Sequence, residues 1–319
     1  MMLSPESFAK AREFLLTQAR PLERALFHYH FEGATTAEAR LALTIYQNAD
    51  GGFGRALEPD LRLPGSSALA TSVAFQHLRD LGLNARDPMV RAAVRWSQAA
   101  FERTLGRWPA VPADANGWPH APWWTWTSPD VPGFVANPCV ELVAHLWHYR
   151  EAADAGFLSE VTASTEGLVK ALPEKPAMHD LLCLLCLAET PAVPAVLRNQ
   201  AALHARRAGP AIVARAPKAW TGYAVKPLLL APRSDSLLAP LLGDTLAANL
   251  DFEIGRQGAD GSWAPNWDWG GNFPGHWVQA ELEWKGVVTL QTLLTLRSYG
   301  RIAATEHEAV GQTYSLAHG

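Results

Sequence analysis

The sequence predicts an all-α fold, built as a single domain over residues 1–319. Apolar residues recur at helical spacing in about eleven stretches, and almost no alternating strand pattern interrupts them. The turn sequence at residues 47–53 returns at residues 257–263, and a long helical pattern runs into each copy. No linker-like stretch divides the chain, so we expect the helices to share one core.

Both turns read Gln, two residues, Asp-Gly, a small residue and an aromatic. Gly51 and Gly261 can adopt the left-handed conformation, and the preceding aspartates can accept hydrogen bonds from amides two residues on. The Gln amides can satisfy free backbone groups at a helix end. Residues 70–82 and 288–300 then share a Thr, a Leu-Arg pair and a closing Gly at equal spacing. These echoes indicate a structural repeat of helix, turn, loop and helix.

The individual helices are predicted in chain order from their patterns and end signals. Ser4 as N-cap with Pro5 at the first helical position opens the first helix, and Asp87-Pro88 opens the fifth. The predicted helices cover residues 5–19, 22–31, 36–47, 66–81, 88–105, 139–152, 158–172, 177–189, 192–208, 241–256 and 284–299. Residues 106–138 form a Trp- and Pro-rich insertion, and residues 211–233 are ambiguous and could hold an extended segment.

Composition narrows the setting of the protein. The net charge of -4 gives no basic footprint for nucleic acid. The first residues lack the basic and apolar regions of a signal peptide, and no apolar run is long enough to span a bilayer. Three cysteines suggest reduced thiols, so we expect a cytoplasmic protein. The oligomeric state stays open, and the unusual number is 13 Trp.

The two Gln-x-x-Asp-Gly-x-aromatic turns resemble the QW motif of squalene–hopene cyclases and other triterpene cyclases, and related repeats occur in protein prenyltransferases. Small bacterial prenyltransferase-like proteins look similar too. The resemblance implies an α/α toroid of about eleven to twelve helices around a central cavity. It also implies an isoprenoid or other apolar ligand. The Asp-x-Asp-Asp acid and the Asp-Asp-x-x-Asp diphosphate site of terpene cyclases are absent, so their catalytic residues carry over to no position here.

Candidate catalytic acids follow the two turns. Glu58 and Asp60 lie in the loop after the first turn, and Glu283 lies before the helix that follows the second. The first and last repeats of a closed toroid are neighbours, so these acids should share one rim. A carboxyl group beside aromatic walls can have a raised pKa and act as an acid. Alternatively, the acids pair with arginines of their own loop or cap helix N-termini.

Aromatic side chains crowd the same two regions. A Trp-rich loop can form a stacking wall for a ligand, or a plug that closes the toroid. Indole faces stabilise a cation by ~0.5–2 kcal/mol, and they also stack on sugars. The predicted substrate-binding residues are His120, Trp123, Trp124, Trp126, Trp267, Trp269 and His276.

No metal site and no cofactor are predicted. His179, Cys183 and Cys186 share one helix face, but leucines surround them and favour core packing. His145 and His148 also share a face, but no carboxylate pattern supports ligation there. The histidines and cysteines are therefore expected to be structural.

Three functions fit these residues. The first is an enzyme acting on an isoprenoid or similar apolar substrate, with an acid from the loops after the turns. The second is a carbohydrate-active α/α-barrel enzyme that uses paired carboxylates and Trp platforms. The third is a non-catalytic binding protein. A dry aromatic cavity favours the first, and polar groups around paired acids favour the second.

Overall fold

The structure is a computed structural model that describes residues 1–128 and 136–303. Within these ranges it contains thirteen α-helices, three short 3₁₀ helices and no β-strand, which confirms the predicted all-α class. Residues 129–135 of the predicted insertion and residues 304–319 of the predicted domain lie outside the described ranges. No helix in the described part is long and apolar enough to cross a membrane.

The helices begin and end close to most of the predicted positions. They are α1 (Pro5–Thr17), α2 (Pro21–Phe31), α3 (Thr36–Thr44), α4 (Ala68–Asp80), α5 (Pro88–Ala99), α6 (Cys139–His148), α7 (Ala155–Ala171), α8 (Met178–Ala188), α9 (Ala195–Ile212), α10 (Pro227–Leu230), α11 (Ala239–Leu242), α12 (Asp244–Gly255) and α13 (Pro274–Ser298). The 3₁₀ helices are η1 (Ala113–Gly117), η2 (Pro122–Trp124) and η3 (Pro217–Ala219).

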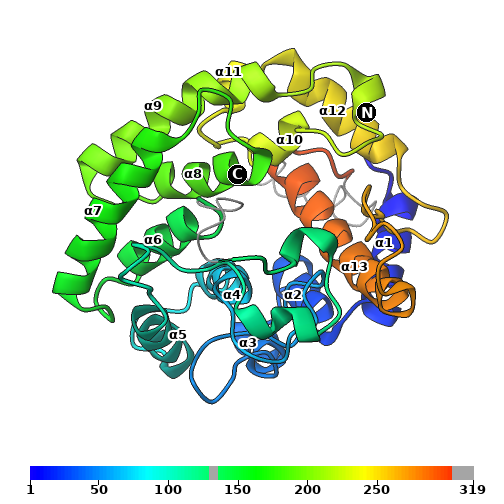
Figure 1. The fold of residues 1–319 in the computed structure, drawn as a ribbon. Helices are drawn as coiled ribbons and strands as arrows, with labels where there is room; N and C mark the ends of the chain where they lie inside the picture. Colours follow the sequence, from blue (N-terminus) through cyan, green and yellow to red (C-terminus); the bar gives the residue numbers. More distant parts are fainter. Residues whose placement is uncertain (129–135, 304–319) are drawn as a thin grey trace, which may run out of the picture.

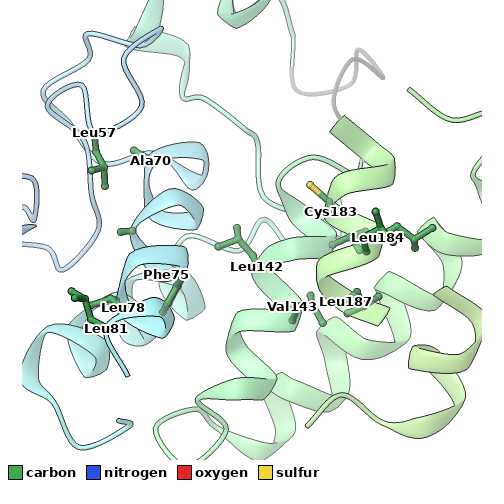
Figure 2. Packing of buried hydrophobic residues seen from close by; sticks show 14 of the residues in the cluster. Leu57, Ala70, Phe75, Leu78, Leu81, Leu142, Val143, Cys183, Leu184 and Leu187 are labelled. Atoms are coloured by element: carbon green, nitrogen blue, oxygen red, sulfur yellow. The ribbon is translucent and has the colours of Figure 1, made fainter. Parts of the chain in front are cut away.

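Helices that follow one another along the chain pack against each other. Contacts join α1 to α2, α2 to α3, α4 to α5 and α6, α6 to α7 and α8, and α8 to α9 and α10. The last helix, α13, returns to pack on α1 and α2, so the first and last helices of the described residues lie side by side (Figure 1). Apolar side chains of α4, α6 and α8, such as Phe75, Leu142 and Leu184, fill part of the core between these helices (Figure 2).

The two predicted turns have the same hydrogen bonds. Asp50 Oδ1 accepts from Gly52 N at 3.0 Å, and Asp260 Oδ1 accepts from Ser262 N at 3.0 Å. The aromatic residue of each turn donates its amide to the hydroxyl of the matched threonine in the next helix: Phe53 N to Thr71 Oγ1 at 3.0 Å, and Trp263 N to Thr289 Oγ1 at 2.9 Å. Gly51 and Gly261 have φ of 96° and 85°. The sequence echo is therefore a structural repeat.

Each repeat turn also contacts the N-terminal part of another helix. Gln47 Nε2 donates to Met89 O of α5 at 3.0 Å, and Gln257 Nε2 donates to Ser7 O of α1 at 2.8 Å. A Cβ atom on Gly261 would lie 2.3 Å from the Lys10 carbonyl oxygen, so only glycine permits this approach. Within the described residues, α1 therefore contacts the second turn as α5 contacts the first turn.

Replacing Gln257 by Ala is expected to destabilise the fold without touching the candidate acids. The variant loses the hydrogen bonds from Nε2 to Ser7 O and to Gly261 O, at 2.8 and 2.9 Å. We expect the free energy of unfolding to fall by about 1–2 kcal/mol, measured by urea denaturation. Gln47→Ala is the matched variant, since its amide makes the equivalent bonds. Unchanged stability in both variants would contradict a structural role for the turns.

The largest differences from the predicted helix ends are at α13 and α5. α13 begins at Pro274 rather than near residue 284, because Phe273 adopts a left-handed φ of 44° and Pro274 takes the first helical position. α5 ends at Ala99 rather than near residue 105. A turn replaces its last predicted residues: Glu102 N donates to Arg107 O at 3.1 Å, with Gly106 at φ 65°.

This turn after α5 shares one contact with the second repeat turn. The Trp108 indole donates to the carbonyl of Ser97 in the preceding helix at 2.7 Å, as the Trp263 indole donates to Glu253 O at 2.7 Å. It lacks the Gln-Asp-Gly signature of the repeat turns, so the sequence pattern did not predict it. The ambiguous residues 211–233 contain η3 and α10 and no strand.

Candidate functional site

The loop between the first turn and α4 carries two of the candidate acids and has a strained backbone. Arg55 and Ala56 have φ of 56° and 59°, a region that residues other than glycine rarely adopt. The buried Arg20 guanidinium holds this conformation, because its Nη1 donates to Ala56 O at 2.8 Å and to Leu57 O at 3.2 Å. Arg20 is itself fixed by the Glu23 carboxylate, at 2.8 and 2.6 Å.

Asp60 lies at the centre of a tryptophan cluster. Its Oδ1 accepts hydrogen bonds from the indoles of Trp269 at 2.8 Å and Trp284 at 2.7 Å, and its Oδ2 accepts from Trp267 at 3.2 Å. The residue is 3 % exposed. Burial raises the pKa of Asp60, and the three indole donors act in the opposite direction. Both carboxylate oxygens are therefore occupied, and Asp60 orients three rings.

Glu58 is the acid with an unoccupied oxygen. Its Oε1 lies 3.4 Å from the Trp124 indole nitrogen, whereas its Oε2 is buried and has no hydrogen-bond partner among the described residues. Burial, with the neighbouring Asp60 carboxylate, raises the pKa of Glu58 well above its ordinary value. The side chain is therefore a carboxylic acid that holds its proton more strongly than an exposed glutamate does, beside a second carboxyl group.

The raised pKa of Glu58 predicts how stability depends on pH. The folded state keeps a proton that the unfolded state releases above the ordinary pKa of 4.5. That contribution to stability is complete below this pH and is lost as the pH rises through the folded pKa. We expect the free energy of unfolding to fall as the pH rises above about 4.5 and through the raised pKa of Glu58, and Glu58→Gln to weaken this fall. The free energy of unfolding is measured by urea denaturation at several pH values. If it fell equally with pH in the wild type and in Glu58→Gln, the burial of a neutral acid at this position would be contradicted.

Glu283 reaches the same region from α13. Arg62 binds it in a bidentate salt bridge, at 2.6 and 3.1 Å, and Gln279 Nε2 donates to it at 3.0 Å. Arg20 Nη1 lies 4.0 Å away. The structure thus brings Glu283 next to the loop of Glu58 and Asp60 across more than two hundred residues of sequence, and it pairs Glu283 fully with its neighbours.

The predicted aromatic residues divide into two groups. Trp124, Trp267 and Trp269 contact the two acids through their indole N–H groups. Trp123 is 38 % exposed, and among the described residues it makes no hydrogen bond to the acids. Trp126 is half-buried and packs against the smaller core cluster that contains Trp124 and Trp269.

The two predicted histidines are not directed at the acids. The His120 ring is held within its own loop, with Nδ1 2.6 Å from Trp118 O and Nε2 3.1 Å from Thr125 Oγ1. Backbone bonds join this loop to the acid loop, since Ala121 N donates to Asp60 O at 2.8 Å. His276 is exposed in the first turn of α13. His120 therefore has a structural place beside the site.

Sequence reasoning missed three residues of this region. Trp284 is the third indole donor to Asp60. The sequence pattern predicts a helix that begins at this residue but does not indicate that its side chain belongs to the site. No sequence pattern links Arg20 to the acids, because only the packing of α2 places its side chain beside the loop of Glu58 and Asp60. Tyr223 packs on Trp267, with ring centroids 6.2 Å apart, and its hydroxyl lies 2.7 Å from His179 Nε2. Burial and the nearby Asp60 raise the pKa of Tyr223.

A shallow surface hollow of about 450 Å³ lies elsewhere, beside the first turn. It is lined by Asp50, Arg95, Trp96, Ala99 and Ala100. Its carboxylate, Asp50, is already bound to Gly52 N and Ser66 Oγ. Both bonds use Oδ1, and Asp50 is exposed. The hollow therefore has no buried acid like Glu58, and the buried group of Glu58, Asp60 and their tryptophans is the better candidate site.

Comparisons with protein families, with curated proteins and with solved structures found no match to this chain. The chemistry of the site must therefore be argued from its own residues.

Proposed function

We propose that the helices close into an α/α toroid, and that the protein is a terpenoid-cyclase-like enzyme that protonates an isoprenoid or similar apolar substrate. The matched docking of the two turns, one on α5 and one on α1, supports the closed ring. The free cysteines fit a reducing, cytoplasmic setting. Glu58 carries the proton in this proposal, and the tryptophans around Asp60 form the wall of the site.

One observation carries the assignment of Glu58. Of the three candidate acids, Glu58 alone keeps a carboxyl oxygen without a partner among the described residues. Its raised pKa, caused by burial and by the Asp60 carboxylate, favours the protonated form that a general acid needs. Transfer of that proton to a carbon–carbon double bond leaves a carboxylate on Glu58 and a carbocation on the substrate.

The surrounding rings suit the developing positive charge. The indole N–H groups of Trp267, Trp269 and Trp284 all donate to Asp60, which fixes the rings without using their π faces. Trp267 and Trp284 are half-buried, so part of each ring stays accessible. A cation over an indole face gains about 0.5–2 kcal/mol. Asp60 thereby serves as a positioning residue, and its negative charge also favours a nearby cation.

The same contacts disfavour the carbohydrate alternative. Glycoside hydrolysis by the usual mechanisms needs two working carboxyl groups, one as acid and one as base or nucleophile. Asp60 is occupied by three indoles, and Glu283 is occupied by Arg62 and Gln279. A single available acid fits a reaction that begins with protonation and needs no carboxylate nucleophile.

A deuterium experiment tests the proposal. The protein is incubated in D₂O with a panel of linear polyprenyl alcohols and diphosphates, and in parallel with aryl glycosides. We expect an isomerised or cyclised isoprenoid product that carries one deuterium on carbon, detected by mass spectrometry. Release of the aryl group from a glycoside, with no reaction of any isoprenoid, would instead favour the carbohydrate-active alternative and overturn the proposal.

A further inference from the structure

A second group of polar side chains lies between α6 and α8, apart from the acids described above. Glu141 and His145 are one helical turn apart on α6, and Cys186 comes from α8. One ligand atom from each residue lies within 4.8 Å of the other two. A carboxylate, an imidazole and a thiol are the donors that zinc accepts in proteins.

His145 has an unsatisfied ring nitrogen at the centre of this group. The residue is 1 % exposed, and its buried Nε2 has no hydrogen-bond partner among the described residues. The nearest carboxylate oxygen, Glu141 Oε1, lies 3.6 Å away, which is too long for a hydrogen bond. That separation matches the edge of a tetrahedron around a metal with bonds of about 2.0–2.3 Å. A buried ring nitrogen that lies 3.6 Å from a carboxylate oxygen and has no hydrogen-bond partner among the described residues needs an explanation.

We propose that Glu141, His145 and Cys186 bind a divalent zinc-type cation, through a carboxylate oxygen, Nε2 and Sγ. Three protein ligands leave a fourth position open for water or a ligand, as in catalytic rather than structural zinc sites. The site is distinct from Glu58 and does not depend on its role.

The surroundings of Glu141 support ligation. Gln76 Nε2 donates to its Oε1 at 2.8 Å, and Ser72 Oγ donates to its Oε2 at 3.0 Å. Both donors come from α4, so the carboxylate is fixed between two helices. Metal-binding carboxylates are usually oriented by such hydrogen bonds. The group of three ligands is therefore already held in place without a metal.

Arg79 opposes metal binding and gives the proposal a specific signature. Its Nη1 lies 3.1 Å from His145 Nδ1 and 3.6 Å from Cys186 Sγ, and its Nη2 donates to Thr190 Oγ1 at 3.1 Å. Arginine can only donate, so Nδ1 accepts and the ring proton is assigned to Nε2. A metal on Nε2 moves that proton to Nδ1, and the thiol proton leaves to solvent. Arg79 must therefore withdraw from Nδ1 toward Thr190.

The sequence contained half of this pattern. From the sequence, His145 is considered only together with His148, and no metal site is predicted there. The carboxylate of Glu141, four residues before His145, is the ligand that this prediction misses. Cys186 was assigned to core packing with Cys183. Only the packing of α6 on α8 brings the two helices' donors together.

A cobalt titration of the chelator-treated, full-length protein tests the site. Co²⁺ replaces zinc and reports a thiolate ligand by charge-transfer absorption in the near ultraviolet. We expect one Co²⁺ per chain with this absorption. Cys186→Ser should lose the absorption, while Cys139→Ser, which removes a buried thiol outside the group, should keep it. Glu141→Gln, which preserves the shape of the side chain, should weaken binding by at least ~10-fold.

Arg79→Gln should tighten cobalt binding, because it removes a positive charge and a competitor for Nδ1. Circular dichroism of each variant separates loss of the site from loss of the fold. Absence of the charge-transfer band in the folded wild-type protein, or its survival in folded Cys186→Ser, would overturn the proposal. A band whose strength is the same in folded Glu141→Gln, at limiting Co²⁺, would also overturn it.

Discussion

Replacing Glu58 by Gln is expected to lower turnover of an isoprenoid substrate by about 10²–10⁴-fold, the usual contribution of a positioned general acid. The amide keeps the size of the side chain and can still accept from the Trp124 indole, which lies 3.4 Å from Oε1 in the wild type. It cannot deliver a proton of comparable acidity. The measurement is the rate of deuterium incorporation into product at saturating substrate.

The Glu58→Gln variant should fold and bind normally. At a pH above the ordinary pKa of glutamate, burial of the Glu58 carboxyl group costs the folded state free energy, and the neutral amide of Gln avoids this cost. The stability of the variant at neutral pH should therefore equal or exceed that of the wild type. Quenching of tryptophan fluorescence reports substrate binding independently of turnover. A matched control is Glu6→Gln, which changes an exposed carboxylate on α1. Full turnover in folded Glu58→Gln would remove the acid from the mechanism.

Local chemistry made the turns predictable from sequence. The Asp-Gly pairs, the glutamines and the matched threonines all act within a few residues or through one repeated contact, so their spacing carries the information. The helical class followed for the same reason, since helical periodicity is local. The start of α13 was missed, because Phe273 and Pro274 define it through backbone conformation rather than through apolar periodicity.

The site was predictable only in outline. The expectation that the first and last repeats meet placed Glu283 beside Asp60, because both flank matched turns. The hydrogen-bond partners in this region could not be predicted from sequence, because they come from three different parts of the chain. They include Arg20, Arg62 and Trp284. Those partners decide which acid is available. Spacing could suggest three equivalent candidates, whereas the contacts separate one free acid from two occupied ones.

Replacing Asp60 by Asn is expected to lower the free energy of unfolding by about 2–4 kcal/mol. Hydrogen bonds to a charged group contribute about 1.5–3 kcal/mol each and are not additive. In the variant, one of the two positions that accept indole N–H groups becomes an NH₂ donor. At least one of Trp267, Trp269 and Trp284 then faces a donor and loses its partner. The loss of a buried charge offsets part of this cost, which keeps the expected value below the sum of three bonds.

The same variant tests how Asp60 acts on Glu58. The Asp60 carboxylate, with burial, raises the pKa of Glu58, so removing the charge should lower that pKa and shift the fall of stability with pH toward more acidic values. Asp114→Asn, an exposed carboxylate in η1, is the control and should change stability by no more than about 0.5 kcal/mol. Urea denaturation over a pH series measures both effects. If Asp60→Asn matched the control in stability and pH profile, the indoles would not depend on Asp60, and the wall proposed for the substrate cation would lose its support.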